Sequence, residues 1–139
     1  MKDQNCIFCK IAGGDIPSTT VYEDGVCRVI LDLSPAAKGH ALILPKEHAA
    51  DLFALSDETA QHVILVAKKV GSAMKKALSC DGLNLVQNNG EAAGQTVMHF
   101  HLHLIPRWKG DGAMVQWEPH SSDPEEQNRL AEKIREALS

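Results

Sequence analysis

The spacing of apolar and polar residues predicts one long helix in the middle of the chain. Between residues 56 and 78, apolar side chains recur every three or four positions, which is typical of a helix with one buried face. Ser56 is suited to cap the first turn, where the acidic residues that follow favour the helix dipole. The expected buried stripe consists of Val63, Val66, Val70, Met74 and Ala77. His62 lies off this stripe and is expected at the surface.

Shorter apolar segments predict strands on both sides of this helix. Residues 21–23 and 27–31 flank Asp24-Gly25, a strong signal for a hairpin turn. The other expected elements are strands at 41–44, 83–86 and 96–105, a helical turn at 6–12, and an amphipathic helix from Pro124 with Leu130, Ile134 and Leu138 on one side. This order predicts an α+β fold with a mainly antiparallel sheet, in a single domain over residues 1–139.

Charge and composition narrow the classes of partner. The formal net charge of −4 argues against binding to nucleic acid. No apolar run approaches the roughly 18–20 residues of a membrane span, and the polar N-terminus lacks the apolar segment of a signal peptide. We therefore expect a cytoplasmic protein that does not contact membranes. Disulfides are rare in that compartment, so the isolated Cys27 and Cys80 are expected to be buried and unpaired.

The most unusual segment holds three histidines in alternation with apolar residues. In an extended strand, His99, His101 and His103 share one face, whereas Met98, Phe100, Leu102 and Leu104 share the other. Histidine at three successive positions of one face is improbable for the solvent side of an ordinary edge strand. The outer two Cα atoms of such a strand lie about 13 Å apart, too far for one metal ion to take all three rings. We therefore expect the histidines to divide their tasks.

The His-x-His-x-His pattern with apolar intervening residues resembles the signature of the histidine-triad (HIT) family. Residues 88–97, 32–35 and 39–48 also match that family, and the similarity runs from Cys6 to about Arg107, closest to the bacterial Hint-like branch. The family cleaves or transfers nucleoside monophosphates. The resemblance implies a five-stranded sheet in each subunit and a homodimer in which two such sheets join into one of ten strands.

The resemblance also assigns roles to individual residues. His101 would attack the α-phosphorus to form a covalent nucleotidyl-histidine, with His103 and His40 holding the non-bridging oxygens and Asp32 the ribose hydroxyls. The other implied substrate-binding residues are Asn88, Gly94, Gln95, Thr96 and Val97. From the residues alone, Asp32 could instead be a turn residue and His40 a surface residue. Asn88 and Gln95 could equally shape a glycine-containing loop.

The Cys6-x-x-Cys9 pair predicts a metal site. A thioredoxin-type redox motif would follow a strand, and none is expected before Cys6. A tetrahedral structural zinc site needs two further ligands. Resemblance to zinc-binding bacterial members of the family supplies His48 and His99, which leaves His101 and His103 for the phosphate. The alternative is a pair of reduced cysteines without metal.

The expected function is hydrolysis of a purine nucleoside monophosphate derivative, that is, a derivative of AMP or GMP. The derivative would be either a phosphoramidate or a dinucleoside polyphosphate. One alternative is a zinc-dependent hydrolase in which His99 and His101 bind a catalytic metal ion. Another is a nucleotide-binding or interaction module whose catalysis is vestigial. The C-terminal segment, 108–139, follows the family pattern least closely. In it, Trp117 could reach the partner's site in the dimer or serve only as a hydrophobic cover.

Overall fold

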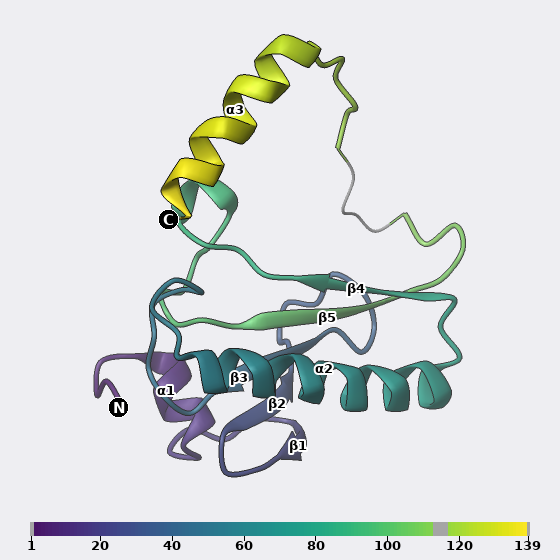
Figure 1. Cartoon of the computed structure of the whole chain (residues 1–139). Helices are drawn as coiled ribbons and strands as arrows, with labels where there is room; N and C mark the ends of the chain where they lie inside the picture. The colour runs from purple at the N-terminus through teal and green to yellow at the C-terminus, as the bar shows by residue number, and fades with distance from the viewer. Residues whose placement is uncertain (1, 113–116, 139) are drawn as a thin grey trace.

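The structure is a computed structural model that describes residues 2–112 and 117–138, and these form one antiparallel sheet with three α-helices. The strands lie in the order β1-β2-β3-β5-β4, as Figure 1 shows. Their bounds are β1 Thr20–Glu23, β2 Cys27–Leu31, β3 Ala41–Pro45, β4 Gly82–Val86 and β5 Leu102–Arg107. The helices are α1 Ile7–Ala12, α2 Asp57–Leu78 and α3 Pro124–Ala137, with a short 3₁₀ helix, η1, at Glu91–Ala93. The predicted α+β fold is confirmed.

Helix α2 begins where its capping residue predicts. The Ser56 hydroxyl accepts a hydrogen bond from the Thr59 amide, and the buried side chains of the helix pack on β2, β3 and β5. The predicted stripe is correct at Val63, Val66, Val70 and Met74 and wrong at Ala77, which is exposed. Ala77 lines a cavity of about 370 Å³ between the end of α2 and the sheet, so no side chain covers it.

The β1–β2 hairpin forms around Asp24 as expected. Oδ1 of Asp24 accepts hydrogen bonds from the amides of Val26 and Cys27 at 2.8 and 2.9 Å, which holds the turn closed. Its Oδ2 lies 2.7 Å from Nε2 of His62, so His62 is only partly exposed and ties α2 to the hairpin. Cys27 and Cys80 are buried and unpaired, as predicted.

The histidine segment departs from the expected strand. β5 begins only at Leu102, and residues 97–99 form a bend. Burial does not alternate, since Met98 is 48% exposed whereas Phe100 is buried. The reason lies in β3, which pairs with β5 from Ala41 to Ile43 and ends at Pro45, a residue without an amide hydrogen. The Phe100 amide instead donates to the Ala49 carbonyl at 2.7 Å.

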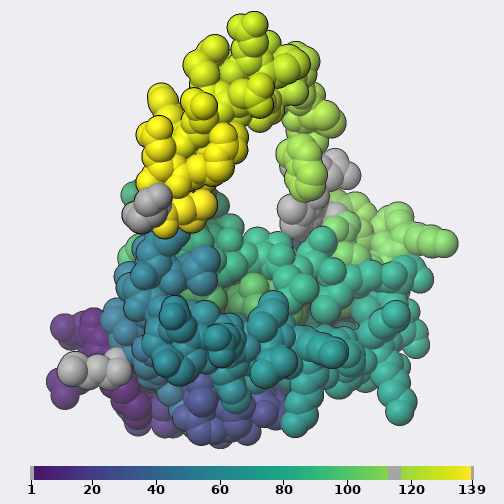
Figure 2. All heavy atoms as spheres, viewed as in Figure 1, coloured from purple at the N-terminus to yellow at the C-terminus, as the bar shows by residue number. Residues whose placement is uncertain are grey.

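The C-terminal helix α3 lies beyond the edge of the sheet, and in Figures 1 and 2 its C-terminal end returns toward the body. Figure 1 shows it beyond β4, and Figure 2 shows open space between it and the body of the protein. The predicted stripe of Leu130, Ile134 and Leu138 exists, yet all three side chains are exposed. Among the described residues, no helix is both long and apolar enough to span a membrane.

Candidate active site

The ring of His101 is held in one orientation. Its Nδ1 lies 2.7 Å from the His99 carbonyl oxygen, and its side chain is 7% exposed. Because a carbonyl only accepts hydrogen bonds, this contact assigns the proton of the neutral ring to Nδ1. The edge-to-face ring of Phe8, with its centroid 5.0 Å away, packs against the imidazole. The lone pair on Nε2 of His101 is therefore free to attack an electrophile.

A second pair of histidines forms a hydrogen-bonded chain beside His101. The Ala36 amide donates to Nδ1 of His40 at 2.9 Å, so neutral His40 carries its proton on Nε2. That nitrogen lies 2.9 Å from Nδ1 of His103 and donates to it. His103 then carries its own proton on Nε2. The ring centroids of His101 and His103 are 5.0 Å apart, which places this second N–H donor next to the His101 ring.

Burial keeps these donors uncharged near neutral pH. It lowers the pKa of His103 to about 4, and the neighbouring rings of His101 and His40 add to that effect. Burial also lowers the pKa of His40, while the charge of Asp32 opposes the shift. A neutral imidazole N–H can donate to a phosphate oxygen without a buried positive charge. The pair thus forms a preorganised donor site for negative charge.

Asp32 lies directly after β2 at the open side of this cluster. Its Oδ1 accepts the Ser34 amide at 2.8 Å, and its Oδ2 is 3.6 Å from Nε2 of His40. The side chain is 20% exposed, so the carboxylate remains accessible to a ligand. The adjoining Leu33 is 96% exposed and offers an apolar surface next to the charge.

The loop from 88 to 97 borders the site and is shaped largely by Gln95. The Gln95 amide nitrogen donates to the carbonyls of Ala50 and Val97, and its oxygen accepts the Gly90 amide. These bonds engage both ends of the buried amide, which favours a loop-shaping role. Of the other residues expected to bind substrate, Asn88 and Val97 are partly buried, whereas Gly94 and Thr96 are exposed.

The expected metal ligands come together on the other side of His101. Candidate ligand atoms of Cys6, Cys9, His48 and His99 all lie within 4.8 Å of one another. Nδ1 of His99 is 3.4 and 3.5 Å from the two sulfurs, and Nδ1 of His48 is 3.4 Å from Cys9 Sγ. Tetrahedral zinc with ordinary bond lengths gives sulfur–nitrogen separations of about 3.6 Å. The donor set and its spacing therefore fit zinc.

The orientation of His99 suits a ligand. Its Nε2 donates to the Pro45 carbonyl at 2.9 Å, which turns the Nδ1 lone pair toward the sulfurs. The side chain is fully buried, and burial lowers the pKa of His99 to about 4. Because its backbone carbonyl holds His101, His99 links the two clusters.

Several groups that shape the site escaped the sequence analysis. The Ala36 amide and the Pro45 carbonyl are backbone groups, which leave no residue-type signal. Phe8 contacts the rings of both His99 and His101, at centroid distances of 6.1 and 5.0 Å. In the sequence, only the position of Phe8 between the two cysteines indicated that it lies near the site.

The sequence model of the HIT domain matches residues 13–110. The chain belongs to the HIT domain family. It is 42% identical to the protein Hit of Bacillus subtilis, with 98% of this chain and 96% of that protein covered. It is 43% identical to an adenosine 5′-monophosphoramidase of Schizosaccharomyces pombe, with 94% and 96% covered.

Solved structures agree with this assignment. A Streptococcus mutans crystal structure superposes with a TM-score of 0.95 at 40% identity, covering 99% of this HIT protein and 88% of the other chain. A zinc-bound histidine triad family protein from Mycobacterium smegmatis has a TM-score of 0.76 at 38% identity, covering 96% and 95%.

Proposed function

We propose that this HIT protein hydrolyses a purine nucleoside 5′-phosphoramidate, or a related dinucleoside polyphosphate, through a covalent nucleotidyl-histidine on His101. The observation that carries the proposal is the 2.7 Å contact between Nδ1 of His101 and the His99 carbonyl, which leaves Nε2 as the nucleophile. The name of the fission yeast relative, an adenosine 5′-monophosphoramidase, supports the phosphoramidate as substrate.

The reaction has two steps. Nε2 of His101 forms a bond to the α-phosphorus while the bond from phosphorus to the leaving group breaks, and a departing amine takes a proton from solvent water. Water then attacks the same phosphorus and releases a proton to solvent, the nitrogen–phosphorus bond to His101 breaks with its electron pair returning to Nε2, and a nucleoside monophosphate leaves. His103 donates to a non-bridging oxygen and is itself oriented by His40, so charge that develops in either step meets a preformed N–H donor. Asp32 accepts from the ribose hydroxyls.

The two rival functions fit the geometry less well. A zinc hydrolase would need His99 and His101 on one metal ion, but His99 turns its free nitrogen toward the two cysteines. Among the described residues, His101 belongs to none of the clusters of three or more side chains that could hold a metal ion. A binding module with vestigial catalysis would not require the ordered protons on His101, His40 and His103.

A structural zinc ion is the second part of the proposal. Cys6, Cys9, His48 and His99 would hold it, and it would join α1 to the segment before β5. Bound zinc would contribute to folding stability and keep His99 in place. The zinc-bound relative from Mycobacterium smegmatis supports this ligand.

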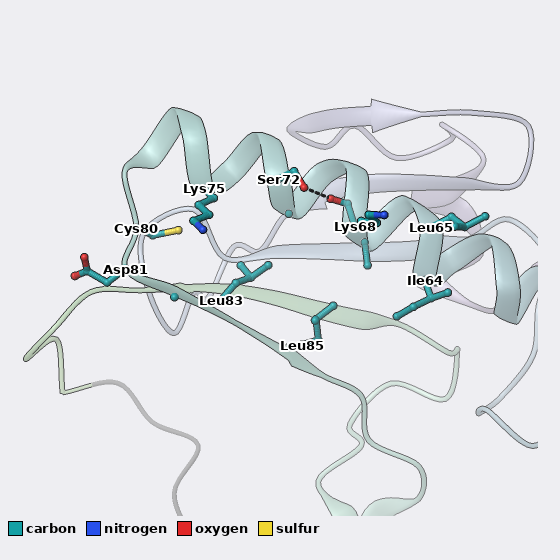
Figure 3. A pocket seen from close by; sticks show the side chains of 12 residues that line it. Ile64, Leu65, Lys68, Ser72, Lys75, Cys80, Asp81, Leu83 and Leu85 are labelled. Carbon is teal, nitrogen blue, oxygen red and sulfur yellow. Dashed lines mark hydrogen bonds between the residues drawn. The ribbon is translucent and has the colours of Figure 1, made fainter.

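A homodimer is the third part of the proposal. β4 is one of the two edge strands of the described sheet, the other being β1, and a second copy that pairs with β4 would extend the sheet to ten strands. Beside this edge lies an apolar groove of about 540 Å³ between α2 and β4 (Figure 3). Ile64, Leu65 and Leu85 border it and are 57%, 65% and 50% exposed. Burying them in the dimer would remove this apolar surface from water.

Trp117 is a candidate to act across that dimer. It lies in the segment between β5 and α3 and is 80% exposed. We expect Trp117→Ala to change the relative rates with different leaving groups, because a residue from the partner would contact that part of the substrate. Equal rates for every substrate would leave Trp117 as a surface residue.

The decisive experiment traps the intermediate. The protein is mixed with adenosine 5′-phosphoramidate, stopped at alkaline pH within one turnover, and digested for mass spectrometry. The expected result is an adenylyl group on the peptide that contains His101, and none in His101→Asn. Turnover with no adduct at any time would overturn the covalent mechanism. Rates with a diadenosine polyphosphate, measured in parallel, identify the preferred leaving group.

A further inference from the structure

Asp24, Cys27 and His62 form a cluster of possible metal ligands that the proposed reaction does not use. Asp24 lies in the turn of the β1–β2 hairpin, Cys27 begins β2, and His62 meets them from α2. One ligand atom from each residue, a carboxylate oxygen, a sulfur and an imidazole nitrogen, lies within 4.8 Å of the other two. The cluster shares no residue with the proposed zinc site or the proposed phosphate site, so it needs its own explanation.

The cluster is open to solvent on one side. Cys27 is fully buried, whereas the side chains of Asp24 and His62 are 22% and 36% exposed. An ion can therefore reach the carboxylate and the imidazole from solvent and meet the sulfur on the inner side. Nε2 of His62 now lies 2.7 Å from Oδ2 of Asp24, and the two atoms would be about 3.4 Å apart on a tetrahedral zinc ion. The partly exposed His62 ring has room to move outward by this difference.

The charges of the cluster favour a cation. Asp24 accepts hydrogen bonds from two backbone amides and from the hydroxyl of Tyr22 at 2.9 Å, which favours its ionised form. Burial and the charge of Asp24 raise the pKa of the Cys27 thiol to about 12, so the thiol keeps its proton when no cation is bound. A divalent ion between these two groups would offset the carboxylate charge and displace the thiol proton to solvent.

The types of donor atom select the kind of metal. Thiolate and imidazole favour zinc and similar transition-metal ions over calcium and magnesium, which prefer oxygen ligands. Zinc accepts three protein ligands with water in the fourth position.

We propose that Asp24, Cys27 and His62 form a second, weaker zinc site, which fastens the β1–β2 hairpin to α2 when it is filled. Three protein ligands hold an ion less firmly than four, and the hydrogen bond between His62 and Asp24 must break first. The site therefore fills only when zinc is added to the purified protein. This inference does not depend on the proposed hydrolysis, because none of the three residues takes part in it.

The first test measures the uptake of added zinc. The purified protein is titrated with zinc chloride by calorimetry, and bound metal is counted after equilibrium dialysis. We expect the natural chain to take up one further ion per chain. His62→Gln keeps an amide that can donate to Asp24 but loses the nitrogen ligand. It should bind this ion at least about 100-fold more weakly, because even the loss of a group behind a ligand costs roughly 10- to 100-fold in affinity.

His120→Gln is the matched control, because His120 is an exposed histidine outside the cluster, and it should bind as the natural chain does. Absence of a further ion in the natural chain, or an unchanged affinity in His62→Gln, would overturn the inference.

The second test identifies the sulfur ligand with cobalt(II), whose bond to a thiolate gives a charge-transfer absorption band. Cys27→Ala is compared with Cys80→Ala, a variant at another buried cysteine. Both variants keep Cys6 and Cys9, so the difference between their bands reports Cys27 alone. We expect a weaker band in Cys27→Ala, and equal bands would overturn the inference. Neither readout depends on turnover or on metal at Cys6 and Cys9, so failure of those proposals would appear separately.

Discussion

His99 and His103 lie two residues to either side of His101, yet their rings have opposite surroundings. His99 is fully buried, with Nδ1 within 3.5 Å of two cysteine sulfurs. His103 is partly exposed and contacts His40 and His101. In each case the partner of one ring nitrogen determines what the other can do. The Pro45 carbonyl turns Nδ1 of His99 toward the two cysteine sulfurs of the proposed zinc site, and Nε2 of His40 leaves His103 with its N–H on Nε2, available to the proposed phosphate.

One short segment thus contributes rings to two different clusters, a candidate metal site and a candidate phosphate site. The backbone bends at residues 97–99, so the first ring turns into the protein while the last remains in β5 at the site. His101 connects the candidate metal site at His99 with the candidate phosphate site at His103, because its Nδ1 donates to the His99 carbonyl and its ring packs beside that of His103. Variants on either side of His101 should therefore separate the two roles.

The largest expected effect is loss of turnover without loss of metal. His101→Asn keeps an N–H group that can donate to the His99 carbonyl but removes the nucleophile. We expect the hydrolysis rate to fall at least about 1,000-fold, because no neighbouring group can form the covalent intermediate. Elemental analysis should find the same zinc content as in the natural chain. Near-normal turnover by the folded variant would assign the attack to another group.

Removing a proposed metal ligand should have the opposite pattern of effects, with a large loss of zinc and stability and a smaller loss of turnover. We expect Cys9→Ser to lose its zinc and to unfold at a lower temperature, since structural zinc contributes directly to folding. Turnover should fall about tenfold, because His99 then holds His101 less firmly. Cys80→Ser, at a buried cysteine outside both clusters, is the matched control and should retain its zinc. Unchanged zinc content in Cys9→Ser would contradict the proposed ligand set.

Local signals in the sequence predicted much of the fold. The Ser56 cap and the spacing of Val63, Val66 and Val70 specify α2 within its own residues, and Asp24 specifies its hairpin. The four metal-ligand candidates also meet as the family resemblance implies. In these cases the determining interactions either lie close in sequence or follow the general pattern of the family.

The errors arose where distant backbone groups decide the structure. Strict alternation around His99 predicts a strand, but Pro45 ends the pairing and the Ala49 carbonyl takes the Phe100 amide. Likewise, Ala77 follows the helical period yet lies over a cavity, which depends on how α2 meets the sheet. Pro45 and Ala49 lie far in sequence from the histidine segment, and the sheet residues around the cavity lie far from Ala77. Periodicity alone therefore could not show where these patterns fail.

A pH titration tests the proposed phosphate site of His103 and His40 separately from the metal site. Burial lowers the pKa of His103 to about 4, below the unfolded value of about 6.5. The unfolded chain therefore binds a proton first, and this group's stabilisation is present above pH 6.5 and lost as the pH falls toward 4. We expect the His103 ring to remain neutral by NMR down to about pH 5. His103→Asn should show a shallower loss of thermal stability over that range. A ring that titrates near pH 6.5 would contradict the effect of burial.

The smallest expected effect concerns Phe8, whose ring contacts those of His99 and His101. Its centroid lies 6.1 Å from that of His99 and 5.0 Å from that of His101, nearly perpendicular to each. Phe8→Leu keeps an apolar side chain but removes the edge-to-face contacts, which are worth about 0.5–1.5 kcal/mol. We expect turnover to fall and zinc release to chelator to quicken, each by less than about tenfold. Phe53→Leu is the matched control, because Phe53 is 84% exposed and should change neither rate. If Phe8→Leu slowed turnover but left zinc release unchanged, Phe8 would position only His101. The His99 carbonyl would then be the remaining link between the metal site and the phosphate site.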